Sequence, residues 1–368
     1  MTKRQARGRI VTVSALYVSR SSATPHMNFT NRPRLGTLAR PTYRKESATP
    51  VICSALWVGP KGRLMAQIRA LMRYRYLLGA MQQIQIAMTV RALCIPEEVA
   101  RLPEIVERWR GASRRMQELA QSDAGAPGRA TTQDSPANVA ARIAEIQADP
   151  LFQASFSQVP SEIKIVSIDE LVAPQRDVNL DYVTELQARL TGRSMEQLVE
   201  FCLAPRAVPP IQEMQTAQNQ ITFTSPSLDL RFIGGVPKAI SEDDIRADYF
   251  GGQPARVITL LVGFGAAPIN VWAAAGRLIL NNGFHRTFAL RNSGITHMPV
   301  VVQHAANPDI EFPDQILGLS RAYLLQNPRP VLVKDFFDDA LTVELRFKPR
   351  VKTVKVAWGS EDSIVPIG

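Results

Sequence analysis

The stretch from residue 268 to residue 303 most constrains what this chain of 368 residues can fold into. Its apolar runs and its helical pattern alternate, and the connections between them are only a few residues long. The predicted elements are strands over 270–273, 277–280 and 298–303 and a helix over 285–292. This order with short connections is typical of an α/β or α+β domain.

Gly283 lies where the second of these strands is followed by the helix, so the next four residues form the first helical turn. The first amides of a helix have no partner within it, and the helix dipole is positive there. Arg286 can hold two phosphate oxygens with its planar guanidinium, and His285 can donate one further hydrogen bond. The turn therefore predicts a phosphate site. The simpler interpretation is that Gly283 only ends a strand and that Arg286 is solvated.

The same stretch resembles the ParB/sulfiredoxin superfamily, whose box is Gly-x-His-Arg or Gly-x-Arg-Arg before an amphipathic helix and a strand. The residues that carry the resemblance are Asn282, Gly283, Phe284, His285, Arg286, Ala289, Gly294, Ile295, Met298, Pro299 and Val300. Upstream, residues 163–176 are similar to the strand and Pro-x-Arg segment that open such domains. The resemblance covers about residues 160–305, with a long insertion at about 204–254.

The resemblance implies a nucleotide site for ATP or CTP, often with Mg²⁺. By position, Gly283, His285 and Arg286 would hold phosphates, Asn282 and Thr287 would help, and Arg176 would be a second phosphate or partner contact. The predicted function is nucleoside triphosphate binding, with phosphotransfer or nucleotide hydrolysis as its enzymatic forms.

Two departures from the family pattern narrow this function. Phe284 occupies the position of the reactive cysteine of sulfiredoxins, which excludes cysteine sulfinic acid reduction. The residues after His304 are too few for the DNA-binding helices of partition proteins. A phosphotransferase would need a carboxylate base, and Asp169, Glu170 and Asp177 are the candidates near the opening segment.

The fold expected from these patterns is α+β, with a ParB/sulfiredoxin-like mixed sheet and helices. The predicted units are a basic disordered arm (1–60), a helical module (61–150), the ParB/sulfiredoxin-like domain (156–310) and a C-terminal helix and hairpin (311–368). Within the helical module, apolar steps of three and four predict a helix over 63–94, and residues 122–135 predict a flexible linker.

Further elements follow from local patterns. They are helices over 136–147, 181–190, 194–203 and 313–326, a strand over 256–263, a helix start at 241–244, and two hairpins, 221–224 with 228–233 and 341–347 with 351–358.

The charge is concentrated at the N-terminus. Residues 1–75 hold fifteen Lys or Arg and one Glu, a net charge of +14, while the rest of the chain has a net charge of −4. This favours an alternative function, a nucleic-acid-associated accessory protein with a regulatory or degenerate nucleotide pocket. The alternating arginines and tyrosines of 73–76 would then stack on bases, or else lie at the edge of a core. An organelle-targeting peptide and an arm without function are the other interpretations.

Composition excludes several classes. An apolar fraction of 45% and a charged fraction of 21% fit a folded chain rather than a disordered or collagen-like one, and no apolar run is long enough to span a membrane. Cys53, Cys94 and Cys202 form no paired motif, which favours a reducing, cytoplasmic location. With four histidines and no Cys/His cluster, no metal site is predicted.

Overall fold

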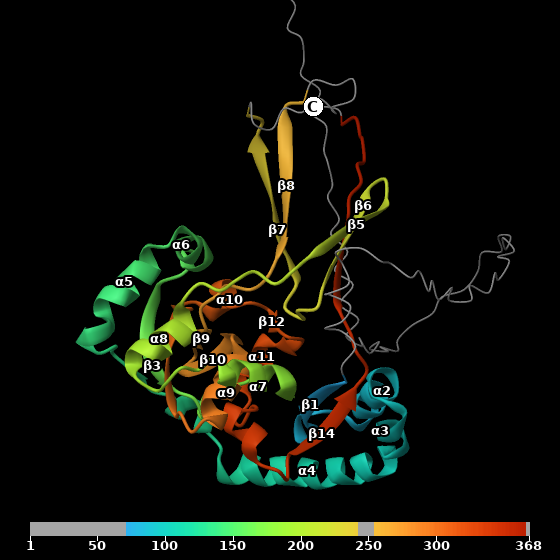
Figure 1. Cartoon of the computed structure of the whole chain (residues 1–368), viewed down its shortest axis with the longest axis vertical. Coiled ribbons are helices and arrows are strands. Elements are labelled where there is room, and N and C mark those ends of the chain that lie inside the picture. Colours follow the sequence, from blue (N-terminus) through green and yellow to red (C-terminus); the bar gives the residue numbers. More distant parts are fainter. Residues whose placement is uncertain (1–70, 242–253, 366–368) are drawn as a thin grey trace, which may run out of the picture.

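The computed structural model describes residues 71–241 and 254–365, and it confirms a mixed α+β fold with several small sheets (Figure 1). The predicted arm (1–60) and most of the predicted helix start at 241–244 lie outside the described residues. None of the described helices is long and apolar enough to cross a membrane.

The main sheet has five strands in the order β10–β9–β11–β3–β2. Their bounds are β2 Thr132–Gln133, β3 Ser161–Ser167, β9 Asn270–Ala274, β10 Arg277–Asn282 and β11 His297–His304. The pair β11–β9 is parallel and the other pairs are antiparallel. The strands predicted over 270–273, 277–280 and 298–303 are therefore confirmed, because each is an apolar run that the sheet buries.

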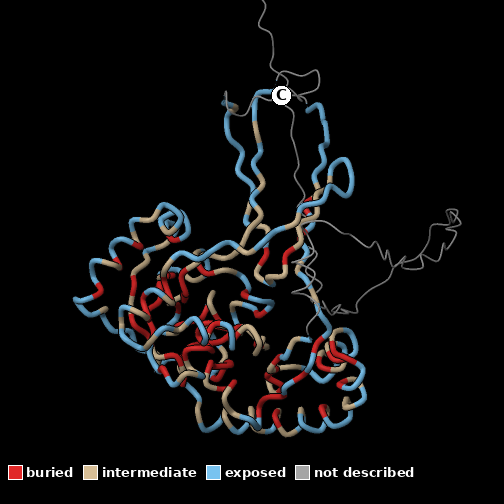
Figure 2. The backbone as a smooth tube through the Cα atoms, in the orientation of Figure 1, coloured by how far each residue is buried: buried red, intermediate tan, exposed pale blue. Residues whose placement is uncertain are grey.

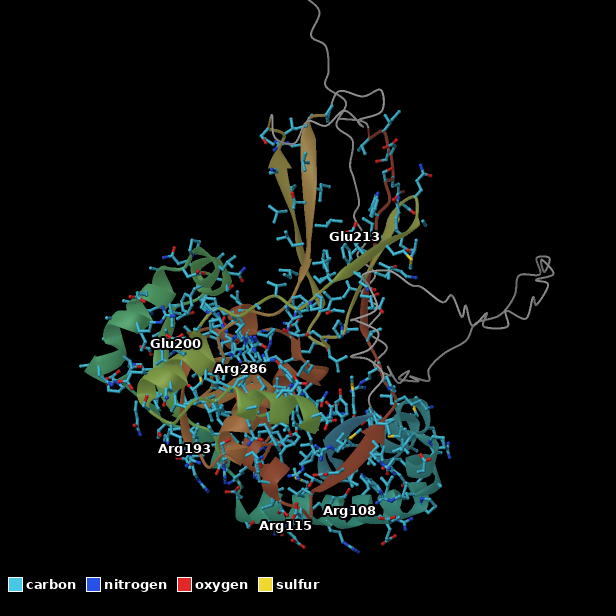
Figure 3. All side chains as sticks on the ribbon, in the orientation of Figure 1. Arg108, Arg115, Arg193, Glu200, Glu213 and Arg286 are labelled. Carbon is cyan, nitrogen blue, oxygen red and sulfur yellow. The ribbon has the colours of Figure 1, made fainter. Side chains whose placement is uncertain are left out.

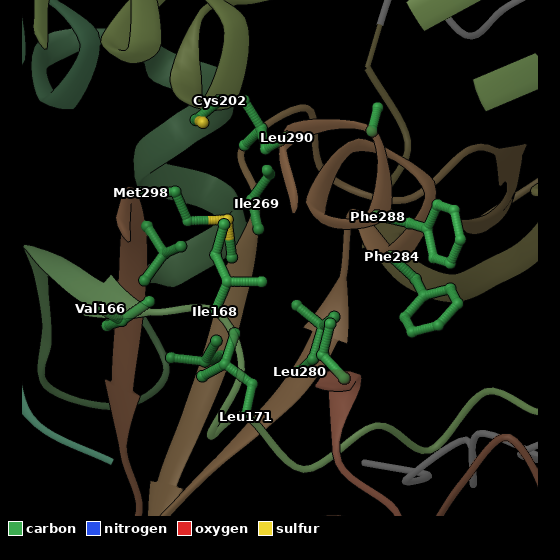
Figure 4. Close-up of a cluster of buried hydrophobic side chains, with 14 of the residues drawn as sticks. Val166, Ile168, Leu171, Cys202, Ile269, Leu280, Phe284, Phe288, Leu290 and Met298 are labelled. Carbon is green, nitrogen blue, oxygen red and sulfur yellow. The ribbon is translucent and has the colours of Figure 1, made fainter. Parts of the chain in front are cut away.

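Three helices pack beside this sheet and close its core: α7 Leu180–Ala188, α8 Met195–Leu203 and α9 Phe284–Asn292. Asn179 caps α7 and Ser194 caps α8 through their side-chain oxygens, as their residue types favour. Figure 4 shows part of this core, where Met298 of β11 and Leu280 of β10 lie among the strands and Phe284 and Phe288 project side by side from α9. The helices predicted over 181–190 and 194–203 are confirmed within two residues.

A second sheet has the order β14–β1–β4. Because β1 lies within residues 63–94, the prediction of one continuous helix over that range is wrong. Its strands are β1 Met72–Leu77, β4 Asp177–Asn179 and β14 Thr342–Phe347. In β1 the arginines and tyrosines alternate, so Tyr74 and Tyr76 face the core beside Phe347. This alternation of core-facing and outward-facing side chains has a period of two, which is the strand pattern. The apolar steps of three and four therefore did not indicate a helix at this position. Helix α2 Gln83–Leu93 begins only after the short helix η1 Leu78–Ala80.

The remaining N-terminal elements form helices around these sheets. They are α3 Pro96–Ala100, α4 Leu102–Ser122, η3 Ala137–Val139, α5 Ala140–Ala148 and α6 Pro150–Phe156. The flexible linker predicted at 122–135 is wrong: it contains the short helix η2 Ala126–Arg129 and strand β2, and Ala126 is buried. Asp123 pairs with Arg329 from the C-terminal region, which holds this segment against the body.

Two β-structures project from the body (Figure 1). One is the pair β7 Arg231–Ala239 and β8 Arg256–Gly263; the other has the order β15–β6–β5, with β5 Gln212–Ala217, β6 Gln220–Ser225 and β15 Lys352–Ala357. Figure 2 shows that most of the outer residues are exposed. The hairpin predicted from 221–224 and 228–233 is therefore wrong, because β6 pairs with β5 and β7 with β8.

The predicted C-terminal hairpin is also wrong, although both of its strands form. β14 pairs with β1, and β15 pairs with β6. Arg350, between them, lies 4.4 Å from the ring centroid of Tyr74 and 4.9 Å from that of Phe347, so the connection packs on the core instead of reversing the chain.

The helix predicted over 313–326 forms only in its second half. Leu317 and Gly318 have φ of 49° and 80°, a left-handed turn that joins β12 Gln315–Ile316 to β13 Leu319–Ser320. Helix α11 Arg321–Gln326 follows, capped by Ser320. The other C-terminal elements are α10 Pro308–Glu311 and η5 Val333–Phe337.

Candidate functional site

The turn between β10 and α9 depends on Gly283. Its φ is +93°, the left-handed region that glycine tolerates, and a Cβ there would lie 2.7 Å from Cγ1 of Ile269. Any other residue at this position would therefore have a strained backbone and a side chain that collides with Ile269. Because the strand ends at Asn282 and the glycine reverses the local direction, α9 begins at once with Phe284.

The first turn of α9 carries amides without partners. Within the described part of the chain, the amides of Phe284, His285 and Arg286 donate no hydrogen bond, and no side chain caps the helix. Such amides, together with the positive end of the helix dipole, favour an anion.

Arg286 is buried beside this turn, with only 2% of its surface exposed. Its Nη1 donates to the carbonyl oxygen of Cys202 at 2.8 Å and, more weakly, to that of Phe201 at 3.5 Å. These carbonyls belong to the last turn of α8, so Arg286 caps that helix. Figure 3 shows Arg286 within the body, with Glu200 of α8 nearby in the view.

The second terminal nitrogen of Arg286, Nη2, is buried and has no partner among the described residues. Burial and, to a lesser extent, the charge of Arg206 lower the pKa of Arg286 to about 9. A buried donor without an acceptor is costly, so this nitrogen is a place where an anion would gain much.

His285 lies beside Arg286 but is not a cation. Its Nε2 accepts a hydrogen bond from the amide of Asn179 at 3.1 Å, so the proton of the neutral ring is on Nδ1. Burial lowers its pKa to about 4, and its ring meets Tyr182 edge-on. His285 therefore ties α9 to β4, and any contact to phosphate would come from a neutral ring.

The two predicted helper residues are engaged in the fold. Thr287 is fully buried, and its hydroxyl donates to the carbonyl oxygen of Gly283 at 3.2 Å. The Asn282 side chain donates from Nδ2 to the carbonyl oxygen of Ala266 at 2.5 Å. Asn282 stays at the rim of the turn, whereas Thr287 points into the core.

Arg176 is not brought to this turn. Its Nη1 donates to Oε1 of Gln85 at 3.2 Å, and the side chain lines a cavity of about 280 Å³ together with Ser320 and Tyr323. The structure therefore places Arg176 and Arg286 in different surroundings.

The candidate carboxylates are also held elsewhere. Asp169 accepts from Arg291 at 2.6 Å, near the opposite end of α9 from Gly283, and Glu170 follows it in the chain. Asp177, in β4, lies 3.8 Å from Arg350, and burial raises its pKa.

Two residues of the insertion that the sequence analysis did not identify lie beside the turn, Asp229 and Arg231. A third, Arg206, acts on Arg286 through its charge. Asp229 accepts from the amide of Gly265 at 2.9 Å and pairs with Arg231. Its charge raises the pKa of both His285 and Arg286. No local pattern marks these residues, because they reach α9 only through the path of the insertion.

Within residues 71–241 and 254–365, no group of three or more His, Cys, Asp or Glu is arranged to hold a metal ion. No protein-family model, no curated protein and no solved structure matches the chain. The ParB/sulfiredoxin resemblance stays a prediction that rests on the residues of the sequence.

Proposed function

We propose that this protein binds a nucleoside triphosphate, ATP or CTP with Mg²⁺, at the turn from Gly283 to Arg286. Phosphotransfer or hydrolysis would need a carboxylate base, and Asp169 and Asp177 are paired with arginines away from this turn. The specific ParB/sulfiredoxin fold and a cytoplasmic location belong to the same proposal. Its main support is the buried, unpartnered Nη2 of Arg286.

The electrostatics of the turn favour phosphate over a neutral ligand. Free amides, the positive end of the helix dipole and a buried guanidinium all belong to the first turn of α9, and burial reduces the screening of their charges. Because Arg286 also caps α8, ligand binding would link the N-terminus of α9 to the C-terminus of α8.

The test is calorimetric titration of ATP, CTP, GTP and UTP, each with Mg²⁺, into the wild type and Arg286→Gln. Loss of a charge-assisted contact costs about 1.5–3 kcal/mol, so the affinity for the bound nucleotide should fall roughly ten- to hundredfold. Arg286→Lys, which keeps the charge but not the planar fork, should be intermediate.

The matched control is Arg193→Ala. Arg193 is exposed, and its Nη1 lies 3.9 Å from the Cβ position of Gly294, just after α9. The substitution therefore removes one positive charge at the other end of the helix. It should leave affinity unchanged, and thermal unfolding should show that each variant is folded. Binding that survives Arg286→Gln, or no heat with any of the four nucleotides, would reject the proposal.

The alternative function, nucleic-acid binding through the N-terminal arm, rests on the net charge of +14 over residues 1–75. It receives no support from base stacking on β1, because Tyr74 and Tyr76 are buried and Arg73 and Arg75 pair with Asp181 and Glu344. Filter binding across a salt series, with the full chain and with a chain that begins at Leu71, tests it. Equal retention of nucleic acid by both chains would exclude the arm as the nucleic-acid-binding site.

A further inference from the structure

We infer that the cavity beside Arg176 binds a small carboxylate with an apolar body. No residue of the turn from Gly283 to Arg286 lines this cavity, so the inference goes beyond the proposed function and does not depend on it. The cavity has a volume of about 280 Å³ and a guanidinium in its wall. Its lining residues are Ala80, Ala173, Arg176, Gly318, Leu319, Ser320, Tyr323 and Val331.

Four segments that are far apart in the sequence form the walls of this cavity. They are the end of η1, the segment between β3 and β4, β13 with the start of α11, and the segment before η5. Backbone hydrogen bonds hold these segments together. The amide of Leu77 donates to the carbonyl oxygen of Arg176, and that of Ala173 to the carbonyl oxygen of Val331, both at 2.9 Å. The walls are therefore held in place by the fold itself.

Arg176 has guanidinium N–H groups that no described residue accepts. Its Nη1 donates to Oε1 of Gln85 at 3.2 Å, which belongs to a neutral amide, and no described carboxylate forms an ion pair with it. Arg329, the other arginine whose charge acts on Tyr323, is instead bound to Asp335 by two hydrogen bonds. Arg176 can therefore bind both oxygens of a carboxylate, and its single charge matches that of one such group.

Tyr323 and Ser320 add hydroxyl groups to the wall. Burial raises the pKa of Tyr323, and the nearby charge of Arg176 opposes this rise, so the hydroxyl keeps its proton at neutral pH and can donate. Oγ of Ser320 accepts from the amide of Tyr323 at 3.2 Å, which leaves its own O–H to donate. The apolar part of the wall consists of Ala80, Ala173, Leu319 and Val331. A few polar groups in an apolar wall are typical of a small-molecule site.

The volume of the cavity limits the size of the ligand. Ligand pockets usually span about 300–1,000 Å³, so a cavity of about 280 Å³ suits one ring or a short branched chain that carries the carboxylate. A whole nucleoside triphosphate is too large for it. The ligand class of this cavity therefore differs from that proposed for the turn at Gly283.

The experiment is titration of the full chain, followed by NMR, with benzoate, with its neutral isostere benzamide and with acetate. Benzoate should bind at least tenfold more tightly than benzamide, which lacks the charge, and than acetate, which lacks the apolar body. Arg176→Gln should weaken benzoate binding about tenfold and leave benzamide binding unchanged, because only the charge-assisted contact is lost.

Gln85→Glu tests the same contact without removing the positive charge. It places a carboxylate where Oε1 of Gln85 now lies 3.2 Å from Arg176. The new side chain still accepts from the amide of Gln82, so α2 keeps its N-terminal capping box. This internal carboxylate should compete with benzoate and weaken its binding about tenfold.

Arg91→Gln is the matched control, because Arg91 is exposed in the last turn of α2 and does not line the cavity. It should leave benzoate binding unchanged, and thermal unfolding should show that each variant is folded. Equal affinity for benzoate and benzamide, or benzoate binding that is unchanged in both Arg176→Gln and Gln85→Glu, would overturn the inference.

The two proposals fail separately. Arg286→Gln should leave benzoate binding unchanged, and Arg176→Gln should leave nucleotide binding unchanged. Benzoate binding that is lost in Arg286→Gln but kept in Arg176→Gln would place the acid at the turn of α9 and overturn this inference alone. Benzoate binding that depends on Arg176, without binding of any nucleotide, would reject only the nucleotide function.

Discussion

A buried guanidinium needs more acceptors than the C-terminus of α8 provides to Arg286. The carbonyls of Phe201 and Cys202 engage one terminal nitrogen, and the other has no described partner. Leaving a buried donor unsatisfied costs about 1–3 kcal/mol, which a bound anion would recover. The residue is therefore a structural cap that also provides an unused donor.

This gives a prediction for stability. Inorganic triphosphate at a hundred times its dissociation constant should raise the free energy of unfolding by about 2.7 kcal/mol, and Arg286→Gln should remove most of that rise. Thermal unfolding with and without triphosphate measures it. A rise of equal size in the variant would show that the anion binds elsewhere.

Gly283 is the second residue with a specific requirement. Gly283→Ala should destabilise the protein by about 1–3 kcal/mol, because φ is +93° and the new Cβ would collide with Ile269. Gly111→Ala is the control: nothing lies within 4 Å of its Cβ position in the helix α4, so it should stabilise by about 0.4–1 kcal/mol. Urea denaturation compares the two, and equal effects would contradict this account of the turn.

His285 should make stability depend on pH. Its folded pKa, about 4, lies below the ordinary value of 6.5, so the unfolded chain binds the extra proton first. The free energy of unfolding should therefore fall as the pH drops from about 6.5 to 4, by up to roughly 3 kcal/mol from this residue. In His285→Gln the fall should be smaller by that amount, and denaturation at pH 7, 5.5 and 4.5 measures it. Parallel pH profiles would exclude His285 as the cause.

At the scale of elements, β1 joins parts of the chain that are far apart in sequence. Tyr74 of β1 lies opposite Leu345 of β14 on one side and Asn179 of β4 on the other. The strand is therefore central, and the predicted helical module is not independent of the C-terminal extension. This position follows from the alternation of Arg and Tyr, which the apolar steps of three and four obscured.

A central strand predicts sensitivity to proline. Arg75→Pro should cost on the order of 3 kcal/mol or more, because proline removes a ladder hydrogen bond and is rarely tolerated inside a sheet. Arg75→Ala, which loses the pair with Glu344 and the hydrogen bond to the carbonyl oxygen of Phe336 but keeps the backbone ladder, should cost less, about 1–2 kcal/mol. Chemical denaturation gives both values, and similar costs would show that β1 is not a central strand.

At the scale of the whole molecule, the stability is concentrated in the main sheet and not in the projecting strands. Val301 of β11 is fully buried, whereas Val236 of β7 is 54% exposed. Near the body, a small core that contains Leu230, Val354 and Val356 holds the two projections. Among the described residues, no third strand is hydrogen-bonded to the pair β7–β8, and an isolated pair of strands is only marginally stable.

The same substitution at the two valines should separate these regions. Val301→Thr places a hydroxyl in the core and should cost about 1–3 kcal/mol, whereas Val236→Thr should stay within about 0.5 kcal/mol. Hydrogen exchange should likewise be faster in β7–β8 than in β9–β11. A large cost at Val236 would mean that another surface covers this strand in solution.

The sequence by itself determined those elements whose causes are local. Apolar runs joined by short connections predicted β9, β10, α9 and β11 almost to the residue, and Gly283 marked the turn between them, because a neighbour in sequence is also the partner in space.

Only the tertiary structure decided the rest. The two strands predicted within 341–358 form, but they do not pair with each other. β14 pairs with β1 and β15 pairs with β6, each more than a hundred residues away in the sequence. Asp229 and Arg231 likewise come to the candidate site from a distant part of the sequence. Burial of Arg286 and the neutral state of His285 also arise only when α8, β4 and the insertion close around α9, since desolvation depends on what surrounds a residue and not on its neighbours in sequence.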